Sequence, residues 1–205
     1  MVRSVPIKGA RCFCAVVMAI AVALVAASCS TGGDAVATGG GTFDFVSPGG
    51  QTTIRYDPPA VRGAIGELSG DDLMEPGVSV GLENFPGQVV VINVWGQWCG
   101  PCRAEAPALE QVALTMKDQG VQFLGINVRD NNRAAAQDFV TAYDLTYPSI
   151  YDPKMRALMA LGSFPTSVVP ATLVLDREHR VAAVFLKAIT AEELQPVVEQ
   201  IAAEK

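Results

Sequence analysis

The stretch Val89–Pro107, VVVINVWGQWCGPCRAEAP, decides the fold of this chain. It begins with a β-branched run over 89–94 that leaves no position for a solvated face, which predicts a central strand covered on both sides. Gly96 interrupts the run. Pro101 stands near a helix start, where a missing N–H costs little. The stretch therefore predicts a buried strand, a short turn and a helix.

Two cysteines lie on the first turn of the predicted helix. Cys99 and Cys102 are three residues apart, so they share a helix face with about 5–6 Å between their Cβ atoms, and a small adjustment brings them into disulfide range. Cys99 comes first, where converging N–H groups and the helix dipole favour its thiolate and lower its pKa. Cys102 lies a turn deeper and stays protonated until needed. This order of nucleophile and resolving thiol predicts a dithiol–disulfide exchange site.

The same stretch carries a family resemblance. WCGPC over 98–102, after a hydrophobic strand, resembles thioredoxin, and the longer pattern through Pro107 resembles the membrane-tethered TlpA/ResA branch over residues 60–203. Thioredoxin has a buried Asp where this chain has Asn93, and the TlpA/ResA branch typically has Asn there. Glu105 matches a glutamate that this branch uses near its active site. The resemblance implies an α/β, thioredoxin-like fold: a central mixed β-sheet flanked by helices, with an N-terminal β-hairpin extension and a central αβ insertion.

Two other uses of a Cys-x-x-Cys pair fit the sequence poorly. A structural zinc site needs four ligands, and beyond residue 28 the chain offers only Cys29, Cys99, Cys102 and His179, which are widely scattered. A c-type haem attachment site would need a histidine where Arg103 stands. We therefore expect no metal site and no resident cofactor.

Composition and charge narrow the function classes. The 205 residues, half of them hydrophobic, suffice for one ordinary domain plus an appendage. The formal net charge is −6, and removal of residues 1–28, which hold three basic and no acidic residues, would leave 12 basic and 21 acidic residues, or −9. This acidity argues against nucleic acid as a partner and against electrostatic docking on anionic lipid.

The N-terminus has the pattern of a targeting segment. Three basic residues precede the sixteen-residue apolar run Cys12–Ala27, which is short for a membrane span and suits a signal peptide. Residues 26–29, Ala-Ala-Ser-Cys, resemble a lipobox, which predicts a lipoprotein-type signal peptide over 1–28 and lipidation of Cys29. Ordinary secretion with nearby cleavage and an uncleaved anchor are the alternatives. All three place the domain outside the cytoplasmic membrane, and lipidation would hold it at the outer face of that membrane.

Composition also suggests the domain boundaries. The Gly-, Ala- and Thr-rich residues 29–41 predict a flexible tether, and 42–205 form the predicted thioredoxin-like domain. Two of the five cysteines lie in the segment to be removed and Cys29 is the predicted anchor, so Cys99 and Cys102 remain for chemistry.

Periodicity and turn residues predict the other elements. Alternating residues over 42–46 and 51–56, around the sequence SPGG at 47–50, predict a β-hairpin. The remaining predictions, in chain order, are a short strand over 78–82, a turn over 84–87, a helix over 99–117 with a kink at Pro107, a strand over 121–128, a helix over 133–143, an extended piece over 145–153, a short helix over 154–161, antiparallel strands over 173–176 and 181–186, and a last helix capped by Thr190.

A second functional signal is Val169-Pro170, which leads into an apolar strand 68 residues after Cys102. The resemblance implies a cis-proline here that faces the dithiol. The backbone N–H and C=O of Val169 would then pair with an incoming peptide strand. An ordinary trans-proline at a strand edge is the alternative. The candidate substrate-binding residues are Trp98, Gly100, Pro101, Val169 and Pro170.

Three side chains are candidates for supporting the two cysteines. Trp98 is expected to form a flat apolar rim beside Cys99. Asn93 cannot accept a proton, so Glu105 is the candidate that relays a proton to or from Cys102, and its negative charge would raise the pKa of that thiol. The alternative is a solvated Glu105 without a role.

Together these predictions describe a disulfide reductase. The Cys99 thiolate attacks a disulfide in a target protein, and Cys102 then displaces the reduced target and leaves the Cys99–Cys102 disulfide. The resemblance implies apocytochrome c as the target and a membrane protein as the electron donor that recycles the pair. The alternatives are a disulfide-donating oxidase for secreted proteins and a non-turnover module that binds haem or copper. The Gly-Pro dipeptide speaks against the oxidase, because thioredoxin shares it and is a reductant.

Overall fold

The structure, a computed structural model, describes residues 41–204. The predicted signal peptide over 1–28, the lipidation site Cys29 and all but the last residue of the tether lie outside the described residues, so the predicted domain boundaries stay predictions. Within 41–204, no helix combines the length and the apolar character needed to cross a membrane.

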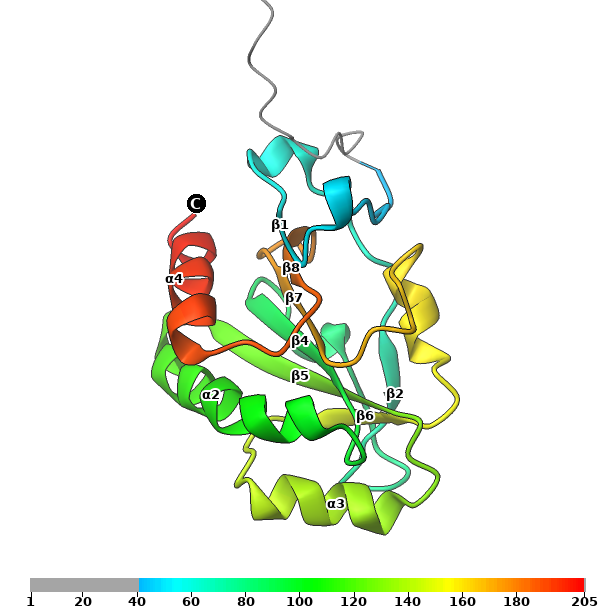
Figure 1. The fold of residues 1–205 in the computed structure, drawn as a ribbon. Coiled ribbons are helices and arrows are strands. Elements are labelled where there is room, and N and C mark those ends of the chain that lie inside the picture. The colour runs from blue at the N-terminus through cyan, green and yellow to red at the C-terminus, as the bar shows by residue number, and fades with distance from the viewer. Residues whose placement is uncertain (1–40, 205) are drawn as a thin grey trace, which may run out of the picture. The chain divides into compact units, whose positions relative to one another are not determined.

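The centre of the fold is a six-stranded mixed sheet with the strand order β1-β8-β7-β4-β5-β6 (Figure 1). β4 is parallel to β5 and antiparallel to β7. β6 adds parallel to β5, whereas β8 and then β1 add antiparallel beyond β7. The strands are β1 (Thr53–Arg55), β4 (Val89–Trp95), β5 (Val121–Val128), β6 (Ser149–Asp152), β7 (Ala171–Leu175) and β8 (Val181–Phe185). The predicted central mixed sheet is confirmed.

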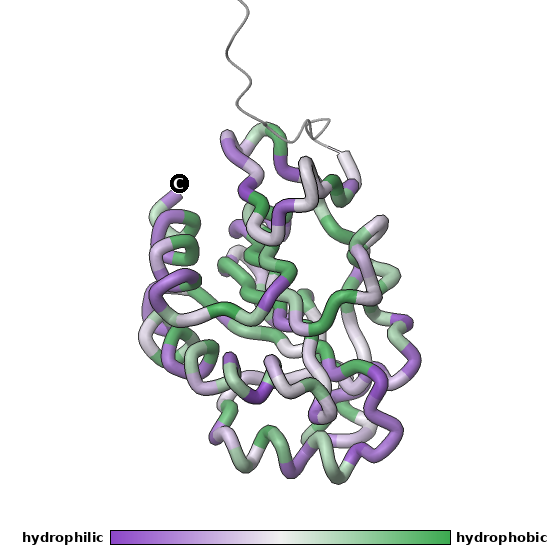
Figure 2. The backbone as a smooth tube through the Cα atoms, in the orientation of Figure 1, coloured by the Kyte–Doolittle hydropathy of each residue, from purple (hydrophilic) through white to green (hydrophobic). Residues whose placement is uncertain are grey.

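β4 lies at the centre because its side chains, apart from Asn93, are apolar toward both faces. All seven of its residues are buried. Val90, Ile92 and Val94 pack into one apolar cluster, while Val89 and Val91 pack into another. In Figure 2 the hydrophobic residues accordingly gather along the central strands. The prediction of a strand covered on both sides is confirmed.

The helices flank this sheet. α2 (Gly100–Met116) and α4 (Ala191–Ala202) pack against each other and close the cluster that contains Val89 and Val91. α3 (Arg133–Ala142) packs its apolar side around Trp95 at the carboxyl end of β4. The side chain of Thr190 accepts a hydrogen bond from the backbone N–H of Glu193 and so caps α4 as predicted.

The predicted N-terminal hairpin is wrong. Residues 42–46 form no strand and make only an isolated bridge from Thr42 to Ala64, and the 3-10 turn η1 (Pro48–Gly50) follows them. β1 pairs instead with β8, so that Ile54 is buried in the same cluster as Val184. The physical reason is that β8 offers an open edge, and pairing there buries more apolar surface than a two-stranded ribbon would.

An antiparallel pair does exist in the N-terminal extension, further along the chain. β2 (Ser69–Asp71) pairs with β3 (Ser79–Gly81), which confirms the strand predicted over 78–82. An isolated bridge from Asp72 to Ile150 ties this pair to β6.

The remaining helices and strands lie where they were predicted, but two are clearly shorter. The extended piece predicted over 145–153 is a strand only in β6. Pro107 lies inside α2, and the kink predicted there stays a prediction. The helix predicted over 154–161 is only the 3-10 helix η5 (Ala157–Leu161), because the carboxylate of Asp152 accepts hydrogen bonds from Arg156 N and Ala157 N and holds the preceding turn open. The other 3-10 turns are η2 (Pro59–Val61), η3 (Leu82–Asn84) and η4 (Lys117–Gln119).

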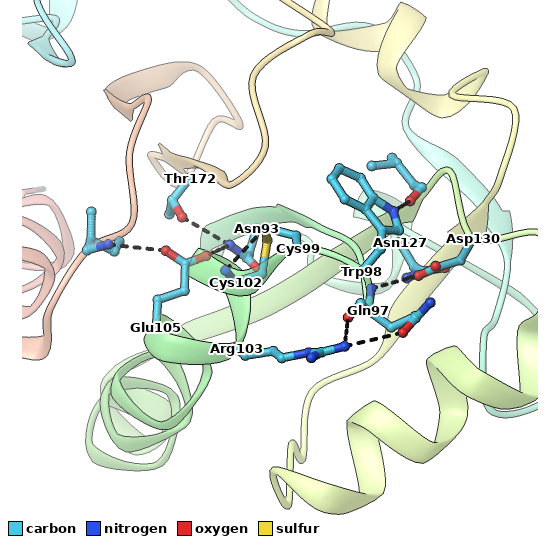
Figure 3. Close-up of a disulfide and its surroundings, with 12 residues drawn as sticks. Asn93, Gln97, Trp98, Cys99, Cys102, Arg103, Glu105, Asn127, Asp130 and Thr172 are labelled. Atoms are coloured by element: carbon cyan, nitrogen blue, oxygen red, sulfur yellow. Dashed lines mark hydrogen bonds between the residues drawn. A yellow bond between two sulfur atoms is a disulfide. The ribbon is translucent and has the colours of Figure 1, made fainter.

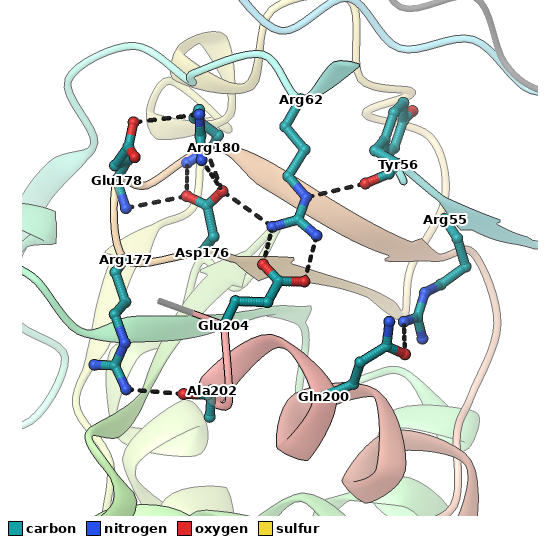
Figure 4. A network of polar contacts seen from close by, with 10 residues as sticks. All are labelled: Arg55, Tyr56, Arg62, Asp176, Arg177, Glu178, Arg180, Gln200, Ala202 and Glu204. Carbon is teal, nitrogen blue, oxygen red and sulfur yellow. Dashed lines mark hydrogen bonds and ion pairs between the residues drawn. The ribbon is translucent and has the colours of Figure 1, made fainter. Parts of the chain in front are cut away.

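A buried ionic network, shown in Figure 4, fastens the extension to the domain. Arg62 is only 2% exposed and donates to Tyr56 O, to Asp176 Oδ2 at 3.2 Å and to both carboxylate oxygens of Glu204. Arg180 pairs with the same carboxylate of Asp176 at 2.9 Å. The network joins four distant segments: the end of β1, the turn after η2, the β7–β8 connection and the C-terminal end.

Candidate active site

The two cysteines of the motif form a disulfide at the N-terminus of α2 (Figure 3). Their Cα atoms are 5.3 Å apart. Cys99 is the N-cap of α2, and its Sγ accepts a hydrogen bond from the backbone N–H of Cys102 at 3.2 Å. Cys99 is 3% exposed and Cys102 is 1% exposed. The predicted placement of the pair on a first helical turn is therefore confirmed.

The loop between β4 and α2 holds Trp98 against the end of β5. Trp98 Nε1 donates to Val128 O at 3.1 Å, and the side chain stays 42% exposed beside Cys99. A Cβ at Gly96 would lie 2.4 Å from that indole nitrogen, so only glycine permits this approach. Trp95, in contrast, is buried and donates to Ser149 Oγ, as a core residue must.

Asp130 holds the loop between β4 and α2 from the end of β5. Its side chain is buried, and Oδ2 accepts hydrogen bonds from Gln97 N at 2.8 Å and from Asn127 Nδ2 at 2.6 Å. Its backbone carbonyl accepts from the hydroxyl of Tyr151 at 2.7 Å. Sequence reasoning missed Asp130. The signal was its position just after β5, because the carboxyl ends of parallel strands meet at one edge of the sheet.

Glu105 lies one helical turn after Cys102 and is buried, with 2% of its surface exposed. Its Oε1 accepts from Asn93 Nδ2 at 2.9 Å, and its Oε2 accepts from Ile189 N at 3.1 Å. Asn93 also donates to Thr172 Oγ1 at 3.2 Å, so these hydrogen bonds join α2 to β4, to β7 and to the segment before α4. The alternative of a solvated Glu105 is wrong.

Burial raises the pKa of Glu105 to about 7, although the hydrogen bonds from Asn93 and Ile189 favour its ionised form. Its charge in turn contributes, after burial, to raising the pKa of Tyr147. Figure 3 shows the carboxyl group, the amide of Asn93 and Cys102 on the same side of α2. A group that titrates near neutral pH therefore sits next to the inner cysteine.

The other wall of the site contains the predicted cis-proline. The Val169–Pro170 peptide bond is cis, as the resemblance implied, and β7 begins directly after it at Ala171. The half-buried side chain of Val169 packs against the cluster that contains Cys99 and Cys102. The Asp57–Pro58 bond is also cis, which the sequence analysis did not predict.

The two remaining predicted substrate-binding residues lie beside the cysteines. Gly100 and Pro101 form the exposed first turn of α2, between the two cysteines. His179 lies at the turn between β7 and β8, at the opposite end of β7 from Pro170, and its Nε2 is 3.1 Å from Phe85 O. The structure does not bring His179 to the cysteines. Within residues 41–204, no three His, Cys, Asp or Glu side chains are grouped so that they could hold a metal ion.

A mixed sheet of this topology with a Cys-x-x-Cys disulfide at a helix N-terminus and a cis-proline beside it defines a thiol–disulfide oxidoreductase. The chain belongs to the Redoxin family, whose sequence model matches residues 59–201.

The most informative similarities are to three oxidoreductases. The thiol-disulfide oxidoreductase ResA of Bacillus cereus is 26% identical over 125 residues, which cover 61% of this chain and 70% of that protein. The crystal structure of a DsbF homologue from Corynebacterium diphtheriae is 46% identical, with a TM-score of 0.73 over 78% of this chain and 99% of the other. A secreted thiol-disulfide isomerase from Corynebacterium glutamicum is also 46% identical, with a TM-score of 0.77 over 80% and 100%. The thioredoxin-like fold and the redox activity are therefore established.

Proposed function

We propose that this enzyme reduces disulfides in protein substrates outside the cytoplasmic membrane, with apocytochrome c as the target. The observation that carries the proposal is the buried carboxyl group of Glu105, which titrates near neutral pH beside the inner cysteine of the disulfide. The similarity to ResA, a thiol-disulfide oxidoreductase, supports dithiol–disulfide exchange as the chemistry.

The reaction begins with the reduced pair. The Cys99 thiolate, favoured by the helix N-terminus and by the N–H of Cys102, attacks one sulfur of the target disulfide, and the other target sulfur leaves as a thiolate. Cys102 then loses its proton and attacks Cys99 Sγ. The second target sulfur leaves, the target has gained two electrons, and the enzyme holds the Cys99–Cys102 disulfide. A membrane electron donor returns it to the dithiol.

In the second step, Glu105 accepts the proton that Cys102 loses. A base acts best when its pKa lies near the working pH, and a pKa of about 7 keeps part of Glu105 ionised and ready to accept the proton of Cys102. In the recycling direction, the protonated carboxyl group returns that proton. Asn93 positions the carboxyl group through its hydrogen bond to Oε1.

The substrate segment lies between two walls. Trp98, with Gly100 and Pro101, forms the exposed wall beside Cys99. Val169 and Pro170 form the other wall, and the backbone of Val169 pairs with the extended target chain that carries the reactive cysteine.

We propose that the enzyme lies in the cell envelope, anchored by lipid to the outer face of the cytoplasmic membrane. The signal-peptide pattern over 1–28 and the resemblance of residues 26–29 to a lipobox support this location. The similarity to a protein described as secreted supports the exported location.

Disulfide isomerisation or oxidation is the second candidate, because the two solved structures at 46% identity are described as a DsbF homologue and as a thiol-disulfide isomerase. We favour reduction on physical grounds. An oxidant such as DsbA stabilises its reduced form, whereas the ionisable group buried beside this pair is a carboxyl group, which opposes a thiolate at Cys102.

A trapping experiment tests the proposal. The reduced enzyme is mixed with an oxidised peptide of the sequence type Cys-x-x-Cys-His, and the free thiols of the peptide are counted. We expect the wild type to reduce the peptide, Cys102→Ser to stop at a mixed disulfide through Cys99, and Cys99→Ser to form none. A wild type that transfers no electrons to the peptide would overturn the proposal.

The role of Glu105 needs its own control in that assay. Glu105→Gln should slow the second step and flatten its dependence on pH between 6 and 8, since the base is gone. Glu110→Gln is the matched control, because Glu110 is a buried carboxyl group of the same helix that accepts hydrogen bonds from Thr146 instead. It should keep the wild-type pH profile.

A further inference from the structure

Arg129 occupies an unusual position at the end of β5. Its backbone has a φ of 58°, in the left-handed region that favours glycine, yet the residue is an arginine with an exposed side chain. An arginine kept in a backbone conformation that favours glycine indicates that its side chain has a role.

Three contacts fix that guanidinium group. Its Cζ lies 5.9 Å from the centre of the Trp98 ring, its Nε donates to Met155 Sδ at 3.2 Å, and its Nη2 donates to Thr166 O at 2.9 Å. Trp98 adjoins Cys99, and Thr166 belongs to the loop that leads to Val169 and Pro170. Arg129 therefore contacts one wall of the proposed substrate cleft at Trp98 and the loop that leads to the other wall.

The charge of Arg129 is not neutralised within the part of the chain that the structure describes. Arg62, Arg133 and Arg180 each form ion pairs there, whereas Arg129 has no carboxylate within 4 Å in residues 41–204. The neighbouring acid, Asp130, is buried, and its Oδ2 accepts hydrogen bonds from Gln97 N and Asn127 Nδ2. Nη1 of Arg129 has no hydrogen-bond partner among the described residues, so donors remain for a ligand.

We propose that Arg129 is a specificity-determining residue that favours target segments carrying a carboxylate next to the reactive cysteine. The inference rests on the proposed function, because it assigns a substrate class to the same cleft. In a chain with a net charge of −6, a fixed cation without an ion pair beside Trp98 gives acidic segments a local attraction.

The test uses three short peptides that differ only in the residues flanking a single cysteine: Asp, Asn or Lys. The cysteine carries a neutral 2-thiopyridyl group as a mixed disulfide. The Cys99 thiolate of the reduced full-length enzyme attacks the peptide sulfur and releases the thiopyridyl thiolate, whose absorbance gives the rate, and Cys102 then releases the peptide thiol. Each rate is divided by that of the same peptide with dithiothreitol, which removes the intrinsic reactivity of the peptide.

The wild type should react about threefold to tenfold faster with the Asp peptide than with the Lys peptide, and the preference should shrink as salt is added. Arg129→Gln should abolish the preference and Arg129→Glu should reverse it. Lys117→Gln also removes one positive charge, but at a position about 22 Å along α2 from Cys102. This variant should keep the wild-type preference for the Asp peptide. The ratio is independent of any change in the Cys99 pKa, because that change alters all three rates equally.

Two results would overturn the inference, and they are distinguishable. If all three peptides react but Arg129→Glu keeps the wild-type ratio, Arg129 does not select the substrate and the proposed reductase stands. If the reduced wild type reacts with none of the peptides, the proposed function fails and takes this inference with it.

Discussion

Replacement of Glu105 by Gln tests whether a carboxyl group is truly buried beside the dithiol. Burial raises the pKa of Glu105 from its ordinary value of 4.5 to about 7. Because the folded protein binds this proton more tightly than the unfolded chain does, ionisation of Glu105 costs stability. This loss of stability is small below pH 4.5 and grows as the pH rises toward 7. Above that pH it reaches its full size and no longer changes. Glutamine has no such proton and no such cost.

The size of the effect follows from the two pKa values. Proton linkage gives a cost of about 1 kcal/mol at pH 5 and about 3 kcal/mol at pH 8. The free energy of unfolding of the wild type minus that of Glu105→Gln should therefore fall by about 2 kcal/mol between these pH values. Glutamine can accept only one of the two hydrogen bonds from Asn93 and Ile189, but that loss is the same at both pH values and cancels.

The assay is urea-induced unfolding of both proteins at pH 5 and pH 8, with the Cys99–Cys102 disulfide intact so that neither thiol titrates. Glu193→Gln is the matched control. Its hydrogen bond from Lys187 lowers the pKa of Glu193, so this carboxyl group is ionised throughout the range and its difference should stay nearly constant. An equal wild-type-minus-Glu105→Gln difference at both pH values would refute the buried, neutral-pH carboxyl group.

Two further predictions concern the residues that sequence reasoning missed. Arg62→Met should lower the free energy of unfolding by about 3 kcal/mol, because it leaves the buried carboxylate of Asp176 without this partner. Glu204→Gln should cost about 1 kcal/mol or less, since Glu204 lies at the exposed end of the network. Equal urea midpoints for the two variants would contradict this prediction. Asp130→Ala should leave the N–H of Gln97 without its partner and lower the free energy of unfolding by about 2 kcal/mol. Hydrogen exchange at the amide of Gln97 should become faster. Unchanged exchange would show that Asp130 does not hold the loop.

The sequence was sufficient for the parts of the molecule that local patterns determine. The β-branched run of β4 and the helix after it needed only the residues of one stretch, and the spacing of Cys99 and Cys102 placed both on its first turn. The cis-proline came from the family resemblance, not from local physics.

The parts that depend on distant segments could not be predicted in this way. The turn sequence at 47–50 favoured a local hairpin, but the open edge of β8, more than 120 residues away, provided the partner of β1. The burial of Glu105 depends on Ile189, 84 residues further on, and Arg62 meets Asp176 across 114 residues. Such pairs leave no periodic signal, because each depends on how the sheet brings separate segments together.

The reduction potential of the Cys99–Cys102 pair tests most directly whether the enzyme is a reductant. The full-length protein is equilibrated in thiol buffers of defined potential, and the fraction of disulfide is followed by the fluorescence of Trp98 and Trp95. We predict a value below about −220 mV, on the reducing side of the glutaredoxins. A value near about −120 mV, that of the oxidant DsbA, would contradict the account and make the enzyme a disulfide donor.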